Sequence, residues 1–450
     1  MHRFLVMTAG AFVALASVAL AGAVPLPTNF DASVMAGNEA EHAIAVNPTN
    51  PSNIVAMSTL SDVPAGLSSN VSMNGGRTWT HRVLGLPGDP LGEICCDEQL
   101  AWDRFGNLWM VYLVNTNTNV PVAVSTDGGR TFTKVAEIQT DGDQPSIAVG
   151  PSSVWLSFAK YPGRVIHAYG APVTGLGRFG SFVGPQTIPG GNGSGKGNYG
   201  DTAVGPNGQV MVTYQQRDDG QSGSHVYTAT DPDGLGPAGF QPAREVARSL
   251  VGGFDFIPAQ PHRSIDVEAS LAWDQSAGPH RDRAYLVWTQ ETANESDDTD
   301  VMFQFSDNEG TTWSAPRRLN TDQTINSQFM QAIALDQTTG ALAVSWYDAR
   351  SDLGAGGEAD TNHVPNDDVQ IWATYSTNGG ATFAPDFRVS RGTSNATAAN
   401  SGFDYGDYTH AAFQSGAFYP AWSDNSNSAG HNPDGTLHKL DLYTAKVSVP

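Results

Sequence analysis

The chain has 450 residues, including 49 Gly and 27 Pro, which is enough for two or three ordinary domains or for one large all-β domain. It carries 23 Lys and Arg against 45 Asp and Glu, so its formal net charge is -22 at pH 7. This charge repels nucleic acid and anionic membrane surfaces, and it excludes both as partners.

The first residues follow the pattern of a secretory signal peptide. His2 and Arg3 form a short basic start, an apolar run extends from Phe4 to Leu20, and small residues at 19–23 offer a cleavage site. We therefore expect residues 1–23 to be removed and residues 24–450 to be secreted, into the periplasm or the medium. An uncleaved membrane anchor is the alternative. No later stretch is long and apolar enough to span a bilayer.

A short apolar strand that contains Ala recurs along the rest of the chain. Its seven copies are predicted at 43–46, 100–102, 146–149, 202–204, 271–273, 332–335 and 411–413. Each is followed by a polar turn and a second apolar strand, as at 108–113, 154–158, 210–214, 285–288, 341–346 and 418–422. Small side chains suit strands that crowd around one axis, and the spacing of the copies is typical of propeller blades.

A second repeat is an eight-residue segment that begins with Ser and ends with Trp or Phe. It occurs at 72–79, 125–132, 306–313 and 376–383, with Asn or Asp at its third position and Gly at its fifth. Asn or Asp followed by Gly favours a hairpin turn, and the Ser hydroxyl can close a hydrogen bond across it. Four copies, each after an alternating apolar strand, predict four similar β-hairpins.

This segment resembles the Asp box, or BNR repeat, of the sialidase superfamily. The resemblance covers most of residues 40–447 and implies an all-β propeller with four-stranded antiparallel blades and Asp-box hairpins. Seven strand units predict seven blades in a single domain, residues 24–450; six blades, the number in true sialidases, and a β-sandwich of repeated hairpins are the alternatives. The seventh unit lacks a fourth strand, which residues near Phe30 to Met35 can supply.

The two cysteines of the chain, Cys95 and Cys96, are adjacent. After export they can form a vicinal disulfide or remain as buried thiols, and both readings stay open. Two thiols without a second pair of ligands do not make a structural zinc site. We expect this pair to brace a loop beside the functional site.

Residues that precede the inner strands or follow the second strands should converge at one mouth of the propeller. The polar candidates there are Glu41, Asp97, Asp143, Tyr199, Arg217, Arg263, Glu268, Tyr347, Asp348, Arg350, Tyr405, Asp407 and Tyr408. Neighbouring carboxylates push their pKa values apart, so one can act as an acid and another as a base or nucleophile. Arg can bind a substrate carboxylate through two hydrogen bonds. Such a mouth is typical of a sugar site.

Sialidases use an early Asp as acid/base, a middle Glu, a late Tyr nucleophile and three Arg for the substrate carboxylate. By chain order, the resemblance gives the catalytic roles to Asp97, Glu268 and Tyr408, with Tyr405 competing with Tyr408. The predicted substrate-binding residues are Arg217, Arg263, Arg350, Tyr199, Asp348, Tyr405 and Asp407, and Arg164 is a further candidate for the arginine triad. The chain departs from the family because it has no Arg between residues 22 and 76.

The leading prediction is a secreted, monomeric, exo-acting glycoside hydrolase that resembles sialidases and acts on terminal acidic sugars of glycans. The alternatives are a polysaccharide lyase acting on uronic-acid glycans and a non-catalytic propeller that binds glycans or proteins. No cofactor is expected to be required. The acidic loops at 295–300 and around Asp360, Asp367 and Asp368 contain enough oxygen ligands for Ca²⁺. No glycine-rich loop joins a strand to a helix, so no nucleotide is expected.

Overall fold

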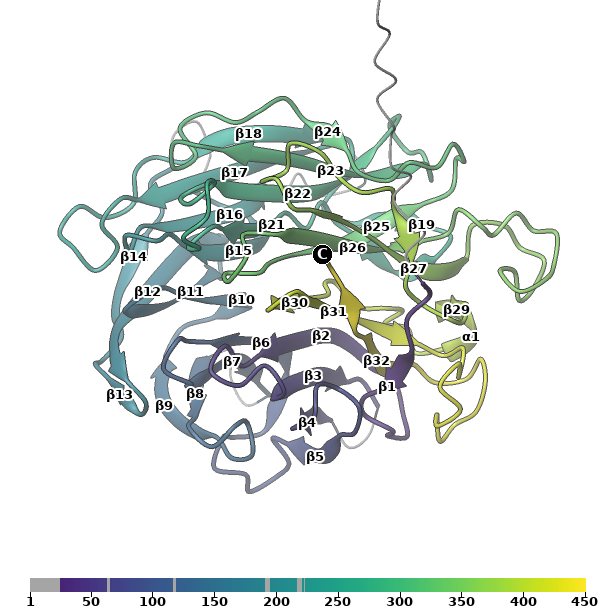
Figure 1. The fold of residues 1–450 in the computed structure, drawn as a ribbon, viewed down its shortest axis with the longest axis horizontal. Coiled ribbons are helices and arrows are strands. Elements are labelled where there is room, and N and C mark those ends of the chain that lie inside the picture. Colours follow the sequence, from purple (N-terminus) through teal and green to yellow (C-terminus); the bar gives the residue numbers. More distant parts are fainter. Residues whose placement is uncertain (1–24, 63–64, 116–118, 191–194, 217–220, 222) are drawn as a thin grey trace, which may run out of the picture.

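The computed structural model describes residues 25–450 except 63–64, 116–118, 191–194, 217–220 and 222, so the predicted signal peptide lies outside the described residues. Seven sheets of four or five strands surround a common centre, with one additional two-stranded hairpin (Figure 1). The predicted all-β class and the seven blades are confirmed, and the alternatives of six blades and of a β-sandwich are wrong. No helix in the described part of the chain has the length and apolar character needed to cross a bilayer.

The blades follow one another in chain order, and every strand pair within them is antiparallel. Blade 1 contains β2 (Glu39–Val46), β3 (Ile54–Leu60), β4 (Gly66–Ser72) and β5 (Thr80–Leu84). Blade 2 contains β6 (Ile94–Trp102), β7 (Leu108–Val114), β8 (Val120–Ser125) and β9 (Thr133–Ile138). Blade 3 contains β10 (Gly142–Val149), β11 (Ser153–Lys160) and β12 (Val165–Gly175), and β12 also pairs with β13 (Arg178–Phe179) and β14 (Val183–Thr187).

Blade 4 contains β15 (Asn198–Val204), β16 (Val210–Gln216), β17 (Ser224–Asp231) and β18 (Arg244–Ser249), and the hairpin of β19 (Asp255–Ile257) and β20 (Gln260–Ile265) follows it. Blade 5 contains β21 (Ser270–Trp273), β22 (Ala284–Glu291), β23 (Thr299–Ser306) and β24 (Arg317–Arg318). Blade 6 contains β25 (Gln328–Leu335), β26 (Leu342–Asp348), β27 (Asp368–Ser376) and β28 (Phe387–Arg388), with β29 (Ser394–Asn395) beside β27 and the short helix α1 (Ala396–Ala399) after it. Blade 7 contains β30 (Ala411–Gln414), β31 (Ala417–Asp424), β32 (Asp441–Ala445) and β1 (Asn29–Asp31), with β33 (Val447–Ser448) beside β31.

The inner strands form a closed ring. Each of β2, β6, β10, β15, β21, β25 and β30 contacts the next, and β30 contacts β2. The apolar core lies between neighbouring blades, as where Met57 of blade 1 and Met110 of blade 2 share one buried cluster. Burial of these faces is the main favourable contribution to folding, so adjacent blades stabilise one another.

The four eight-residue repeats form the same turn. In each, the hydroxyl of the first Ser accepts a hydrogen bond of 2.9 Å from the backbone N–H of the Gly four residues later. The Asn or Asp side chain accepts a bond from the backbone N–H of the Thr four residues after it. The terminal aromatic ring then packs against the apolar core, as Trp79 and Phe132 do. These turns are structural, and they lie at the end of the blades opposite the starts of the inner strands.

The two ends of the described chain close the ring together. Strand β1 pairs with β32, with Phe30 opposite Thr444 and Asp31 opposite Tyr443. The predicted closing strand near residues 30–35 therefore exists, although it ends at Asp31. At this closure the carboxyl group of Asp441 lies against that of Asp31, and Asp441 is fully buried.

This carboxyl pair predicts a pH-dependent stability. Burial, followed by the charges of Asp31 and Glu39, raises the pKa of Asp441 to about 11. Asp441 of the folded protein then keeps its proton at pH values where the unfolded chain has lost it, because the unfolded chain ionises near the ordinary pKa of an Asp side chain. Its free energy of unfolding should therefore fall by up to about 1.4 kcal/mol per pH unit as the pH rises from that value towards 11.

The variant Asp441→Asn has no proton to lose there, and its free energy of unfolding should depend less on pH. Urea unfolding at about pH 5 and about pH 9 measures the difference. The exposed substitution Asp307→Asn is the control and should follow the wild type. Equal pH dependence of wild type and Asp441→Asn would contradict the raised pKa of Asp441.

Candidate functional site

Five of the inner strands, β2, β6, β10, β15 and β25, begin with β-bulges. The pairing register shifts between Ala40 and Ala43 and again between Cys96 and Gln99, and comparable shifts occur in β10, β15 and β25. Non-glycine residues with positive φ occupy equivalent positions two residues before regular pairing resumes: Glu41, Asp97, Gln144, Glu268 and Met330. Such backbone conformations are costly and concentrate at functional sites.

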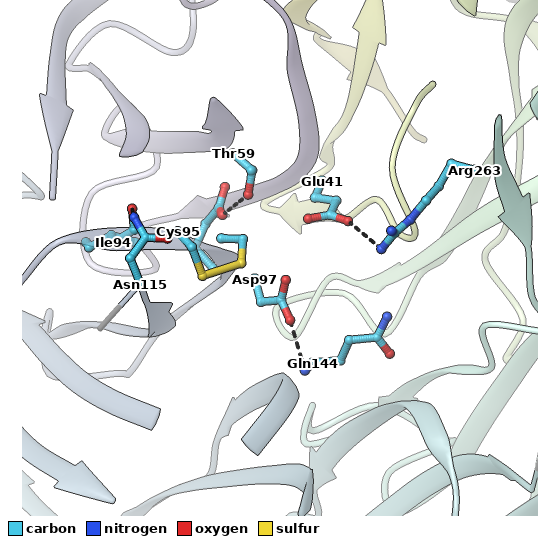
Figure 2. Close-up of a disulfide and its surroundings, with 10 residues drawn as sticks. Glu41, Thr59, Ile94, Cys95, Asp97, Asn115, Gln144 and Arg263 are labelled. Carbon is cyan, nitrogen blue, oxygen red and sulfur yellow. Dashed lines mark hydrogen bonds and ion pairs between the residues drawn. A yellow bond between two sulfur atoms is a disulfide. The ribbon is translucent and has the colours of Figure 1, made fainter. Parts of the chain in front are cut away.

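We call Glu41, Asp97, Glu268, Asp407 and Arg263 the axial acidic cluster. The Arg263 guanidinium forms an ion pair with Asp407, with its Nε 2.6 Å from Oδ1, and its Nη2 lies 3.9 Å from Oε1 of Glu41. The backbone N–H of Asp407 donates to the same oxygen of Glu41 over 3.3 Å. Figure 2 shows Glu41 facing Arg263 and Asp97 facing Gln144.

Gln144 links two carboxylates of this cluster. Its backbone N–H donates to Oδ2 of Asp97 at 2.9 Å, and its side-chain amide donates to Oδ2 of Asp407 at 3.2 Å. Asp97 and Asp407 are therefore held on either side of one residue, although they come from blades 2 and 7. Asp407 also has a cation beside it, whereas the nearest charges to Asp97 are mostly negative.

Burial and like charge raise the pKa values of several of these groups. Burial, followed by the charges of Asp143 and Asp407, raises the pKa of Asp97 to about 8. Burial and neighbouring carboxylates raise the pKa values of Glu41 and Glu268 well above the usual range for Glu. Burial and the charge of Asp97 also raise the pKa of the Tyr408 phenol well above its usual value. At neutral pH the Asp97 carboxyl group is thus mostly protonated, beside the Asp407–Arg263 pair.

A narrow cavity adjoins the cluster, lined among others by Gln144, Asp201, Glu268, Tyr408 and His410. The volume of this cavity is only about 40 Å³. That space holds a few waters and no sugar ring. The side chains of Arg263 and His262 are 37% and 50% exposed, so a larger ligand has to approach the cluster from their side.

Cys95 and Cys96 form a vicinal disulfide in β6, directly before Asp97 (Figure 2). Both residues are half-buried and pack against the apolar cluster between blades 2 and 3. A covalent ring across adjacent residues restricts the peptide that leads into the bulge. The predicted brace beside the site therefore lies next to the bulge residue Asp97.

The β19–β20 hairpin positions Arg263, and the sequence patterns did not reveal it. Asp404 accepts hydrogen bonds from the backbone N–H groups of His262 and Arg263, at 2.7 and 2.8 Å. The side chain of Gln260 accepts from the N–H of Tyr405 and donates to the carbonyl of Gly406. The sequence analysis also missed Gln144, because it searched for side chains that ionise and Gln does not. The position of Gln144 before its inner strand, which matches the positions of Glu41 and Asp97, could have identified it.

The structure brings five of the predicted site residues together: Asp97, Glu268, Arg263, Asp407 and Tyr408. Arg350 instead pairs with Asp348 and Asp386 and stacks on Trp372 in blade 6.

Tyr405 is fully buried, its ring 4.6 Å from that of Tyr347. Arg164 lines a separate surface hollow beside Tyr161. Arg217 and the side chain of Tyr199 lie outside the described residues. The described guanidinium groups of Arg164, Arg263 and Arg350 are thus engaged at different places.

No family model and no curated protein matches this chain. Similar solved structures include an α-L-arabinofuranosidase from Fusarium graminearum, with 13% identity, a TM-score of 0.46, and coverage of 73% of this chain and 93% of that one. A polysaccharide lyase has 9% identity, a TM-score of 0.49, and coverage of 96% and 94%. A Hadza microbial sialidase has 13% identity, a TM-score of 0.44, and coverage of 88% and 73%. With TM-scores below 0.5, these similarities add nothing to the propeller that the strand pairing defines.

The ion pair of Arg263 yields a stability prediction. Arg263→Gln should lower the free energy of unfolding by about 1–3 kcal/mol, because it leaves the buried Asp407 carboxylate beside Glu41 without its cation. Arg263→Lys keeps the charge but loses the planar fork and should cost less. Urea unfolding at neutral pH measures both variants. A glutamine variant as stable as the wild type would show that the pair contributes nothing.

Proposed function

We propose that this protein is a secreted glycoside hydrolase that acts on neutral or amino sugars of glycans. One observation carries the proposal: Asp97 and Asp407 are held by the same residue, Gln144, in opposite electrostatic surroundings. Glycoside hydrolysis uses two carboxyl groups, one protonated to serve as acid and one ionised to serve as base or nucleophile. The export signal predicted at residues 1–23 and the Asp-box-like turns fit an enzyme of this class.

In the proposed mechanism Asp97 is the general acid. Its raised pKa of about 8 keeps the carboxyl group protonated at neutral pH, so it can give its proton to the leaving oxygen of the glycosidic bond. Asp407, paired with Arg263, is the base that activates a water or the nucleophile that attacks the anomeric carbon. Gln144 holds both groups in position.

The electrostatics oppose a sialidase mechanism through Tyr408 and Glu268. A tyrosine nucleophile needs a lowered barrier to losing its proton, and a glutamate partner must be ionised to accept it. Here burial and the surrounding acids raise the pKa values of both Tyr408 and Glu268. We therefore propose that these two residues line the cavity and form hydrogen bonds as protonated groups.

The charge of the mouth favours substrates without a carboxylate. The carboxylate of an acidic sugar would need a free cation, but Arg263, the described cation of the cluster, is already paired with Asp407. Neutral hydroxyls can instead form hydrogen bonds with the carboxyl groups of the cluster, and a protonated amino group would be attracted to Asp407. This argument opposes the terminal acidic sugar that the sialidase resemblance implies as the substrate.

Replacing the proposed acid tests the mechanism. Asp97→Asn should lower kcat by about 10²–10⁴-fold, because it removes proton donation to the leaving group. Wild-type activity should fall as the pH rises through about 8, where Asp97 loses its proton. Initial rates across pH measure both effects. Glu137→Gln, an exposed substitution in blade 2, is the control; an unchanged kcat in Asp97→Asn would reject the assignment.

The substrate class is tested with nitrophenyl glycosides of neutral sugars, amino sugars, uronic acids and sialic acid. We expect release from neutral or amino sugars and none from sialosides. Preferential sialoside hydrolysis would contradict the charge argument. A product that absorbs in the near ultraviolet would indicate a lyase, and binding of glycans without turnover would indicate a recognition protein.

The vicinal disulfide should matter for activity more than for stability. The double variant Cys95→Ser/Cys96→Ser should lose up to about 100-fold in kcat, because Asp97 directly follows the freed segment. Its thermal unfolding should change little, since a bond between adjacent residues closes almost no loop in the unfolded chain. Kinetics and calorimetry together measure this. Full activity in the double variant would show that the disulfide does not position Asp97.

A further inference from the structure

A second group of carboxylates lies in blade 6, outside the axial acidic cluster. Asp352, Asp367 and Asp368 each offer an oxygen within 4.8 Å of those of the other two. All three residues are buried, with exposed fractions of 0%, 6% and 1%. Asp352 belongs to the loop that leaves β26, and Asp367 and Asp368 stand where that loop enters β27.

Protein donors satisfy two of these carboxylates. Oδ2 of Asp352 accepts the backbone N–H groups of Asp367 and Asp368, both at 2.9 Å. Asp368 accepts from the hydroxyl of Thr361 at 2.8 Å and from the amide of Asn395 at 3.0 Å. These contacts fix the positions of Asp352 and Asp368 before any ligand arrives.

Asp367 is different. Its Oδ2 accepts from the amide of Asn362 at 2.7 Å, but its Oδ1 is buried and has no hydrogen-bond partner among the described residues. Leaving such an oxygen without a partner costs free energy. In the described part of the chain, no Lys or Arg forms an ion pair with any of the three carboxylates.

We propose that Asp352, Asp367 and Asp368 bind a Ca²⁺ ion through their carboxylate oxygens. The three groups supply oxygen ligands without His or Cys, which suits a hard cation and excludes a preference for zinc or copper. A divalent cation would balance the negative charges of the three carboxylates and would bind the Oδ1 of Asp367, which has no hydrogen-bond partner among the described residues. Ca²⁺ tolerates irregular ligand arrangements on a loop better than Mg²⁺ does.

The bound ion would fasten the loop 349–367 to the start of β27. This loop joins the second and third strands of blade 6 and therefore lies at the end of the propeller where the inner strands begin. Through Asn395 the site also reaches β29 and the N-terminus of α1. The proposal is independent of the hydrolysis assigned to the axial acidic cluster, because none of that cluster's residues takes part.

Calcium binding is tested on the purified chain after treatment with a chelator. Isothermal titration with Ca²⁺ should show one binding event, and thermal unfolding should move up by a few degrees when Ca²⁺ is added. Asp367→Asn should weaken binding by more than about tenfold, because it removes a charged ligand while keeping the shape. Without Ca²⁺ this variant should be at least as stable as the wild type, since it relieves like-charge repulsion.

Glu358→Gln is the matched control, because Glu358 lies on the same loop but is exposed and pairs with Arg388. It should bind Ca²⁺ as the wild type does. Hydrogen exchange of the wild type provides a readout that needs no variant: Ca²⁺ should slow exchange in residues 351–368. Absence of binding at millimolar Ca²⁺, equal binding by Asp367→Asn, protection elsewhere in the chain, or equal affinity for Mg²⁺ would each overturn the proposal.

Discussion

The bulges at the starts of the inner strands determine the chemistry of the mouth. A regular strand would alternate its side chains between neighbouring blades, whereas the left-handed residues Glu41, Asp97 and Gln144 of three bulges bring polar side chains together at the axis. Because the ring brings these positions together, Glu41, Asp97, Gln144 and Glu268 meet although they come from four blades. The cost of the strained backbone is offset by the apolar packing between blades, which holds each strand in place.

The same crowding explains the electrostatics. Several carboxyl groups share a small volume out of contact with water, and Arg263 is the cation paired with two of them, Glu41 and Asp407. Like charges in one volume oppose one another's ionisation, which contributes to the raised pKa values of Glu41, Asp97 and Glu268. In the proposed mechanism, the different surroundings of Asp97 and Asp407 make an acid and a base available at one pH. In blade 6, no arginine among the described residues pairs with the carboxylates around Asp367, and the proposed Ca²⁺ would balance their charge instead.

The repeats made the architecture predictable, because the Ala-containing strands and the Ser-to-aromatic turns are local patterns with direct structural meaning. The order of the residues in the chain was also enough to predict that Asp97, Glu268 and Tyr408 lie at one mouth of the propeller. It could not assign their roles, which depend on burial and on the sign of neighbouring charges. The docking of the β19–β20 hairpin on Asp404 depends on long-range contacts that no local pattern encodes. Arg350 carried the right chemistry for a substrate site, but its partners Asp348 and Asp386 hold it within blade 6.

The pairing of β1 with β32 also bears on how the protein is made. The strand that completes blade 7 contains residues 29–31 and its partner contains residues 441–445, so the last blade cannot assemble until residue 445 has been synthesised. Contacts this distant in sequence form slowly, and a partly assembled ring exposes unpaired strand edges that favour aggregation. The yield of native protein should therefore depend on chaperones that shield those edges until the final blade docks.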